Sequence, residues 1–224
     1  MPEETFAAEG FQAARERMVE DQLRRRGIRD ERVLDAMLRV PRHEFINAEL
    51  ARLAYDDSPV PIGGGQTISQ PFIVAYMLQL LAIDPNDRVL EIGTGTGYQA
   101  AVLSLLATEV FTMEVRPELA ARARINLART GFTNAVVIDG DGSEGLPSHA
   151  PFDCIIVAAA VPAIPTALAG QLQEGGSMIA PVGSVELQML QLARKSKGSI
   201  ETATLDGCRF VPLIGEAGFP AWHQ

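Results

Sequence analysis

The sequence is short of positive charge. Its 224 residues include 19 lysines and arginines against 28 aspartates and glutamates, which gives a formal net charge of −9. Binding nucleic acid through its phosphates requires a basic surface, so this balance argues against a protein dedicated to nucleic acid. The local basic cluster Arg24–Arg26 is of the kind that usually forms a solvated helix face.

Cysteine and long apolar runs are also scarce. Cys154 and Cys208 lie far apart without the spacing of metal ligands, which predicts no metal site and suits a reducing compartment. The acidic start, residues 1–4, does not resemble a signal peptide. The longest apolar run, residues 154–164, is broken by Pro162 and is too short to cross a bilayer. We therefore expect a cytoplasmic protein that binds no membrane.

Helical and extended patterns alternate along most of the chain. From residue 71 to 183, short apolar strands and amphipathic helices take turns, which predicts a doubly wound, Rossmann-like α/β sheet covered on both faces. Helical spacing before it predicts extra N-terminal helices, and extended patterns after it predict an antiparallel C-terminal edge. The predicted strands are 88–92, 109–114, 135–138, 153–158, 177–182, 187–194, 199–205 and 208–213. The predicted helices are 11–26, 31–40, 43–53, 71–81, 98–106, 117–129 and 164–171, and a Pro- and Gly-rich loop is predicted over 55–70.

The turn after the strand 88–92 carries the clearest ligand signal. Its sequence, Gly-Thr-Gly-Thr-Gly at 93–97, allows a tight turn and a close approach of the backbone to a ligand. The dinucleotide fingerprint would place its last glycine at position 98, where this chain has Tyr98. Glu91, just before the turn, is unfavourable for a pyrophosphate but suits a ligand that presents an amine.

Two further carboxylates follow neighbouring predicted strands. Glu114 lies roughly 20 residues after the first turn glycine, where a carboxylate accepts hydrogen bonds from ribose hydroxyls. Asp141, in Gly-Asp-Gly at 140–142, follows the next strand, where a carboxylate can face an adenine amino group. Taken alone, each of these acids is as well explained by an ordinary polar residue at a strand end or in a turn as by a ligand contact. Together, at the carboxyl ends of adjacent parallel strands, the three acids favour an adenosyl ligand without phosphates.

The segment 61–71 carries a second signal. On its own it predicts a helix start, with Ser69 as the N-cap and Pro71 in the first turn. Combined with the glycine turn, the run Pro-Ile-Gly-Gly-Gly-Gln-Thr-Ile-Ser-Gln-Pro closely resembles the signature of the protein-L-isoaspartate O-methyltransferase family. The resemblance extends over most of the chain, through Phe45 and the segments 40–42, 90–98, 140–142, 151–153, 164–168, 174–176, 181–183 and 210–213.

This resemblance implies a repair enzyme. Such an enzyme transfers a methyl group from S-adenosyl-L-methionine to the free carboxylate of isoaspartyl residues in damaged peptides and proteins, which begins their return to aspartate. Ser69 is implied as the catalytic residue. The implied cofactor-binding residues are Thr67, Ile68, Ser69, Glu91, Gly93, Gly95, Gly97, Glu114, Val115, Asp141 and Gly142. The implied substrate-binding residues are Ile62, Gly63, Val211, Pro212 and Leu213. Phe72 stands where some relatives have a polar residue, so no polar cofactor contact is expected from it.

The resemblance also divides the chain. We predict one methyltransferase domain, with 1–54 as a helical cover, 55–70 as the active-site loop, 71–183 as the cofactor-binding core and 184–224 as the antiparallel part. We expect it to act as a monomer. Whether the N-terminal helices form a lid over the site or a structural cover stays open.

Methyl transfer to a carboxylate needs no general base, because the substrate is ionised near neutral pH (reference pKa ~4). Ser69 is therefore expected to hydrogen-bond and orient the carboxylate. A hydrolase is disfavoured, because the run at 141–145 lacks the first glycine of the nucleophile elbow. Three alternatives stay open: a methyltransferase for a small molecule or another protein group, a nicotinamide-dependent oxidoreductase, and a non-catalytic adenosyl-binding module.

Overall fold

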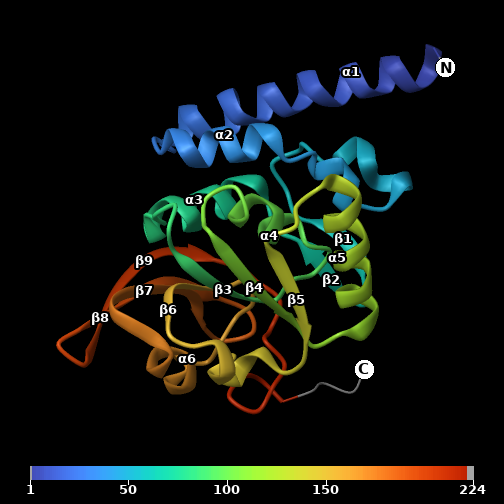
Figure 1. Cartoon of the computed structure of the whole chain (residues 1–224). Helices are drawn as coiled ribbons and strands as arrows, with labels where there is room; N and C mark the ends of the chain where they lie inside the picture. The colour runs from blue at the N-terminus through green and yellow to red at the C-terminus, as the bar shows by residue number, and fades with distance from the viewer. Residues whose placement is uncertain (1, 221–224) are drawn as a thin grey trace.

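The computed structural model describes residues 2–220, with side chains from residue 10 onward. Seven strands form one sheet in the order β5-β4-β3-β6-β7-β8-β9 (Figure 1). The first five in this order are parallel, and β8 and β9 add an antiparallel edge. The strands are β3 (Arg88–Ile92), β4 (Glu109–Glu114), β5 (Ala135–Asp139), β6 (Phe152–Val157), β7 (Leu172–Gly183), β8 (Gln188–Ser196) and β9 (Ser199–Cys208). The predicted doubly wound sheet with an antiparallel edge is confirmed.

Helices cover both faces because the strands are apolar on both sides. Along β3, Val89 belongs to one buried cluster, whereas Leu90 and Ile92 belong to the other. The helices of the sheet are α3 (Pro71–Leu81), α4 (Tyr98–Leu103), α5 (Pro117–Thr130) and α6 (Thr166–Gly170). Helix α6 is shorter than the predicted 164–171, because Pro165 adopts an extended conformation (φ −66°, ψ 123°) and the helix begins only after it.

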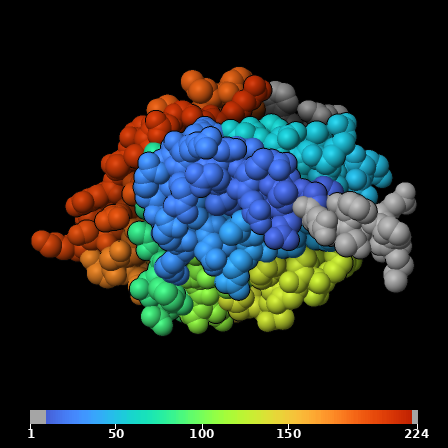
Figure 2. All heavy atoms as spheres, turned by 90° about the horizontal axis from the view of Figure 1, so that it is seen from above, coloured from blue at the N-terminus to red at the C-terminus, as the bar shows by residue number. Residues whose placement is uncertain are grey.

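The N-terminal segment packs over the helices on one side of the sheet, and Figure 2 shows it covering the upper face of the molecule. It contains α1 (Pro2–Arg17), the π-helical η1 (Met18–Leu23), η2 (Arg24–Arg26) and α2 (Glu31–Arg39). Asp30 caps α2 as expected, since its Oδ1 accepts a hydrogen bond of 2.9 Å from the Arg32 amide.

The predicted helix at 43–53 is wrong. Two 3₁₀ segments, η3 (Arg42–Phe45) and η4 (Ala48–Leu53), stand in its place, separated by extended residues at 46 and 47. Phe45 is fully buried, with its ring 5.8 Å from that of Tyr98 in an edge-to-face arrangement. This packing against the glycine-turn helix overrides the local helical propensity.

The segment predicted as a loop contains a small hairpin, formed by β1 (Val60–Gly63) and β2 (Gln66–Ile68). Val60 and Ile62 point into the core while Pro61 and Gly63 are exposed, so the segment alternates as a strand does. The Ile62 carbonyl accepts a hydrogen bond of 3.2 Å from Arg122, which ties the hairpin to helix α5.

The prediction of a last strand over 208–213 is also wrong. The chain leaves the sheet after Cys208, and 211–213 instead run beside Ala160, just past β6. The Ala160 amide donates to the Val211 carbonyl and the Leu213 amide donates to the Ala160 carbonyl, both at 2.8 Å. Val211–Leu213 therefore lie at the carboxyl ends of the parallel strands, where ligands bind such sheets.

Candidate active site

The glycine turn joins β3 to α4 and is held from the neighbouring strand. The amides of Gly93 and Thr94 both donate to the Met113 carbonyl, at 2.9 and 3.1 Å. Gly93, Gly95 and Gly97 have φ values of 96°, 56° and 93°, a region that side chains disfavour. The turn therefore depends on glycine at these positions, as its sequence predicted.

Glu114, at the end of β4, faces this turn. Its Oε2 accepts a hydrogen bond of 2.8 Å from the Gly95 amide, and its Oε1 accepts one of 3.0 Å from the Arg116 amide. Burial raises the pKa of Glu114, although these amides oppose the rise. The carboxylate braces the turn, and each oxygen keeps a lone pair for a ligand.

Glu91 lies beneath the turn and is fully buried. The Thr112 hydroxyl donates to its Oε2 at 2.5 Å, whereas its Oε1 has no partner among the described residues. Burial raises the pKa of Glu91 to about 8, against the opposing hydrogen bond from Thr112. An unpartnered buried carboxylate oxygen suits a ligand that brings its own hydrogen-bond donors, above all a cationic amine.

Asp141 and Gly142 follow β5. The Asp141 carboxylate accepts hydrogen bonds of 2.8 Å from the Ser143 and Glu216 amides, which anchors the C-terminal segment next to the site. Gly142 has no room for a side chain, because a Cβ there would lie 2.6 Å from Cγ2 of Ile92. Gly142 therefore packs directly against Ile92 at the end of β3, and Asp141 supports the segment that follows β5.

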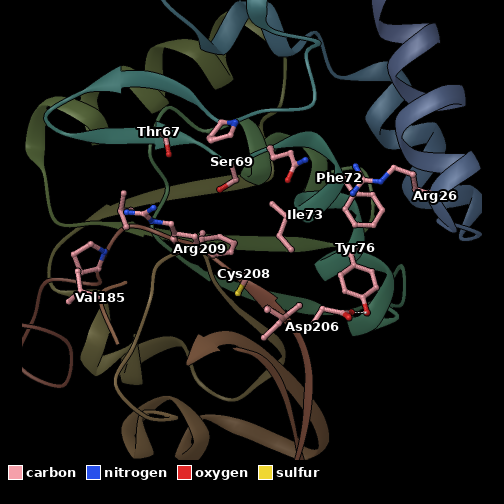
Figure 3. Close-up of a pocket in the computed structure, with 18 residues that line it drawn as sticks. Arg26, Thr67, Ser69, Phe72, Ile73, Tyr76, Val185, Asp206, Cys208 and Arg209 are labelled. Carbon is pink, nitrogen blue, oxygen red and sulfur yellow. Dashed lines mark hydrogen bonds between the residues drawn. The ribbon is translucent and has the colours of Figure 1, made fainter. Parts of the chain in front are cut away.

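Ser69 lies in the loop between β2 and α3. It does not cap α3 as its local sequence predicted, because Gln70 occupies the N-cap position and Pro71 the first turn. Helix bonding starts with the Val74 amide, which donates to the Gln70 carbonyl at 3.3 Å. The Ser69 side chain is half-buried and points toward the large cavity, as Figure 3 shows. Its hydroxyl is thus not committed to the helix start.

Three neighbouring cavities share Thr67 of the hairpin and Ala158 after β6. The largest, about 1150 Å³, is bounded by Ser69, by the aromatic side chains of α3 and by the chain after β9. The second, about 60 Å³, lies between the glycine turn, Glu114 and the 211–214 segment. The third, about 40 Å³, lies between Ser69 and residues 93–96 of the turn. Thr67 lines all three cavities, and Ser69 lines the first and third.

The predicted site residues divide into three groups by location. Those that line at least one cavity are Ile62, Thr67, Ile68, Ser69, Gly93, Gly95, Glu114, Val115, Gly142, Val211, Pro212 and Leu213. Glu91, Gly97 and Asp141 support the turn or its neighbours without lining a cavity. Gly63 is exposed in the hairpin with a φ of 102° and lines none of the three.

Among the lining residues that sequence reasoning missed are Ala158 and Gln99. Ala158 follows β6 and lines all three cavities, and its amide donates to the Ile92 carbonyl at 2.8 Å. Gln99, in α4, lines the third cavity. Ala158 could have been found, because the carboxyl end of the strand beside β3 is where such sheets bind ligands. Gln99 carried no distinguishing pattern.

A sequence model of the family described as protein-L-isoaspartate(D-aspartate) O-methyltransferase matches residues 13–218. A protein-L-isoaspartate O-methyltransferase of Koribacter versatilis is 60% identical over 210 residues, covering 94% of this chain and 95% of that protein. One from Methanoculleus marisnigri is 56% identical over 205 residues, covering 92% and 93%.

A solved protein-L-isoaspartate O-methyltransferase from Plasmodium falciparum, in complex with S-adenosyl-L-homocysteine, aligns with a TM-score of 0.79 at 27% identity. The alignment covers 89% of this chain and 98% of that one. None of the helices within residues 2–220 combines the length and the apolar character needed to span a membrane.

Proposed function

The chain belongs to the protein-L-isoaspartate(D-aspartate) O-methyltransferase family, and on that premise we propose which of its residues carry the reaction. Its activity is methyl transfer from S-adenosyl-L-methionine to the free α-carboxylate of L-isoaspartyl residues in damaged peptides and proteins, which starts their repair to aspartate. When bound, S-adenosyl-L-methionine supplies an electrophilic methyl group on a sulfonium sulfur.

The cofactor is assigned to the cleft around the glycine turn. Glu114 would hold the ribose hydroxyls, and Gly142, with Val115, would border the adenine. Glu91, buried beneath the turn and outside the cavity lining, would act on the ammonium group of the methionine part through its charge and not by direct contact. The homocysteine-containing ligand of the P. falciparum relative supports a cleft for the same group in this chain.

The isoaspartyl peptide is assigned to the large cavity. Val211 and Pro212 line both this cavity and the one at the glycine turn, so they stand where the two ligands would meet. The backbone of an isoaspartyl residue is displaced by one methylene, so a passage fitted to it would hold a normal aspartyl carboxylate away from the methyl group.

Ser69 is assigned as the catalytic residue. Its hydroxyl would donate a hydrogen bond to one carboxylate oxygen and turn the other toward the methyl carbon, without itself being methylated. Positioning of this kind can supply roughly 7–11 kcal/mol of a barrier. The observation that carries the assignment is that Ser69 lines both the large cavity and the small cavity beside the turn.

We also propose that the chain acts as one methyltransferase domain with the divisions given above, as a monomer, and in the cytoplasm. The single domain is supported by one buried cluster whose members extend from Met18 in η1 to Phe210 after β9.

Replacing Ser69 with alanine tests the assignment. We expect kcat for an isoaspartyl peptide to fall about 10²-fold, because the carboxylate loses its orientation. The Kd of S-adenosyl-L-homocysteine, measured by calorimetry, should stay nearly unchanged. Ser58→Ala, at an exposed serine in the same segment, is the matched control and should retain kcat. Equal losses of turnover and cofactor affinity in Ser69→Ala would show a structural role instead.

A further inference from the structure

Arg42 is buried without a carboxylate partner. Its side chain is fully inaccessible to solvent, and none of the ion pairs among residues 10–220 includes it. Burial lowers the pKa of Arg42, yet a guanidinium group remains charged in proteins. A buried cation costs free energy unless its donors are used, so its hydrogen bonds indicate what it is for.

Its two hydrogen bonds reach backbone carbonyls in different segments, while its Nη1 has no partner among the described residues. Nε donates to the Ala54 carbonyl and Nη2 donates to the Ser69 carbonyl, both at 2.7 Å. The Ser69 carbonyl lies outside the hydrogen bonding of α3, which starts from Gln70. Arg42 therefore determines which way the Ser69 peptide group faces.

The same guanidinium packs against the cofactor side of the site. Its central carbon lies 4.7 Å from the centre of the Tyr98 ring, and Tyr98 is the first residue of α4, directly after the glycine turn. Tyr98 is itself buried, with only 2% of its surface exposed. One side chain thus contacts both the loop that carries Ser69 and the helix that begins at the turn.

We propose that Arg42 is a positioning residue, which fixes the Ser69 backbone relative to the glycine turn so that the Ser69 hydroxyl lies in line with the methyl donor. This rests on the proposed role of Ser69. Arg42 lines none of the three cavities, so it acts through Ser69 and not on the substrate. The planar fork of arginine can span two carbonyls, whereas the single ammonium of lysine cannot hold both in the same geometry.

The test compares Arg42→Lys and Arg42→Met with a matched control, Arg32→Met. Arg32, which is exposed, also donates to two backbone carbonyls, those of Ile83 and Leu106, both at 2.6 Å, and lines none of the three cavities. A displacement of about 1 Å can lower a rate about 10²-fold, so we expect kcat to fall roughly 10- to 100-fold in Arg42→Met and less in Arg42→Lys. KM for the peptide and Kd for S-adenosyl-L-homocysteine should change less than threefold. Arg32→Met should lower Tm but leave kcat unchanged.

A double variant separates positioning from general stability. If Arg42 acts through Ser69, Arg42→Lys combined with Ser69→Ala should be no slower than Ser69→Ala alone. The proposal would be overturned if the two substitutions lowered kcat independently, so that their effects multiplied in the double variant. It would also be overturned if Arg32→Met and Arg42→Lys both lost kcat in proportion to their loss of Tm. If Ser69→Ala alone retains full kcat, the role of Ser69 fails instead, which is a distinct outcome. Arg42→Lys preserves the charge, so it keeps the test open if Arg42→Met does not fold.

Discussion

At the scale of single residues, Glu91 combines complete burial with an oxygen that has no partner among the described residues. Near neutral pH, below its folded pKa of about 8, Glu91 is largely protonated before the cofactor binds. An ammonium group next to it would favour the ionised form. Cofactor binding should therefore release a proton in this pH range.

Glu91 also makes the stability of the ligand-free protein depend on pH. Its pKa rises from 4.5 to about 8 on folding, so between these values the folded state keeps a proton that the unfolded chain has lost. The free energy of unfolding contributed by this group falls as pH rises through that window. We therefore expect the Tm of Glu91→Gln minus the Tm of the wild type to increase as pH rises from near 4.5 to near 8.

Thermal unfolding across the pH range checks this expectation. Glu118→Gln, at an exposed glutamate of α5, serves as the control and should follow the wild-type curve. Parallel curves for Glu91→Gln and the wild type would contradict the buried-carboxylate explanation.

At the scale of elements, the glycine turn and the hairpin fit against each other. A Cβ on Gly95 would lie 3.3 Å from Cδ1 of Ile62, and its φ of +56° disfavours a side chain. We expect Gly95→Ala to destabilise the protein by about 1 kcal/mol and to raise the Kd of S-adenosyl-L-homocysteine about tenfold. Calorimetric titration measures the second effect.

Gly131→Ala is the matched control for this element. Gly131 ends α5 with a φ of +82°, and a Cβ there would meet no atom within 4 Å. It should lose a similar amount of stability while binding S-adenosyl-L-homocysteine normally. Equal affinities for Gly95→Ala and the wild type would show that the turn tolerates a side chain and does not contact the ligand.

The elements also show what the sequence can and cannot predict. The parallel core could be predicted because strands such as β3 and β6 are apolar on both faces and end in glycine or loop residues. The hairpin was missed because its strands have only four and three residues around a run of glycines. The chain after Cys208 looked like a strand, but its partner Ala160 lies at the end of a strand, and local pattern does not reveal such pairing.

At the scale of the whole molecule, the site is assembled from segments far apart in sequence. Thr67 and Ser69 come from the hairpin region, Ala158 from the end of β6, and Pro212 from the chain after β9. Thr67, Ser69 and Pro212 could be identified from the family resemblance. The carboxylates of the glycine-turn region could be identified from their positions at strand ends. Arg42 as a contact of Ser69 was not predictable, because only the packed N-terminal segment brings it there.

The most direct test of the whole arrangement is a methyl-transfer assay with two peptides that differ only in whether one residue is isoaspartyl or aspartyl. With radiolabelled S-adenosyl-L-methionine, we expect base-labile methyl ester to accumulate on the isoaspartyl peptide and to be nearly absent from its aspartyl twin. Comparable labelling of both peptides, or none on either while S-adenosyl-L-homocysteine still binds, would contradict a cavity that delivers the displaced carboxylate to the glycine turn.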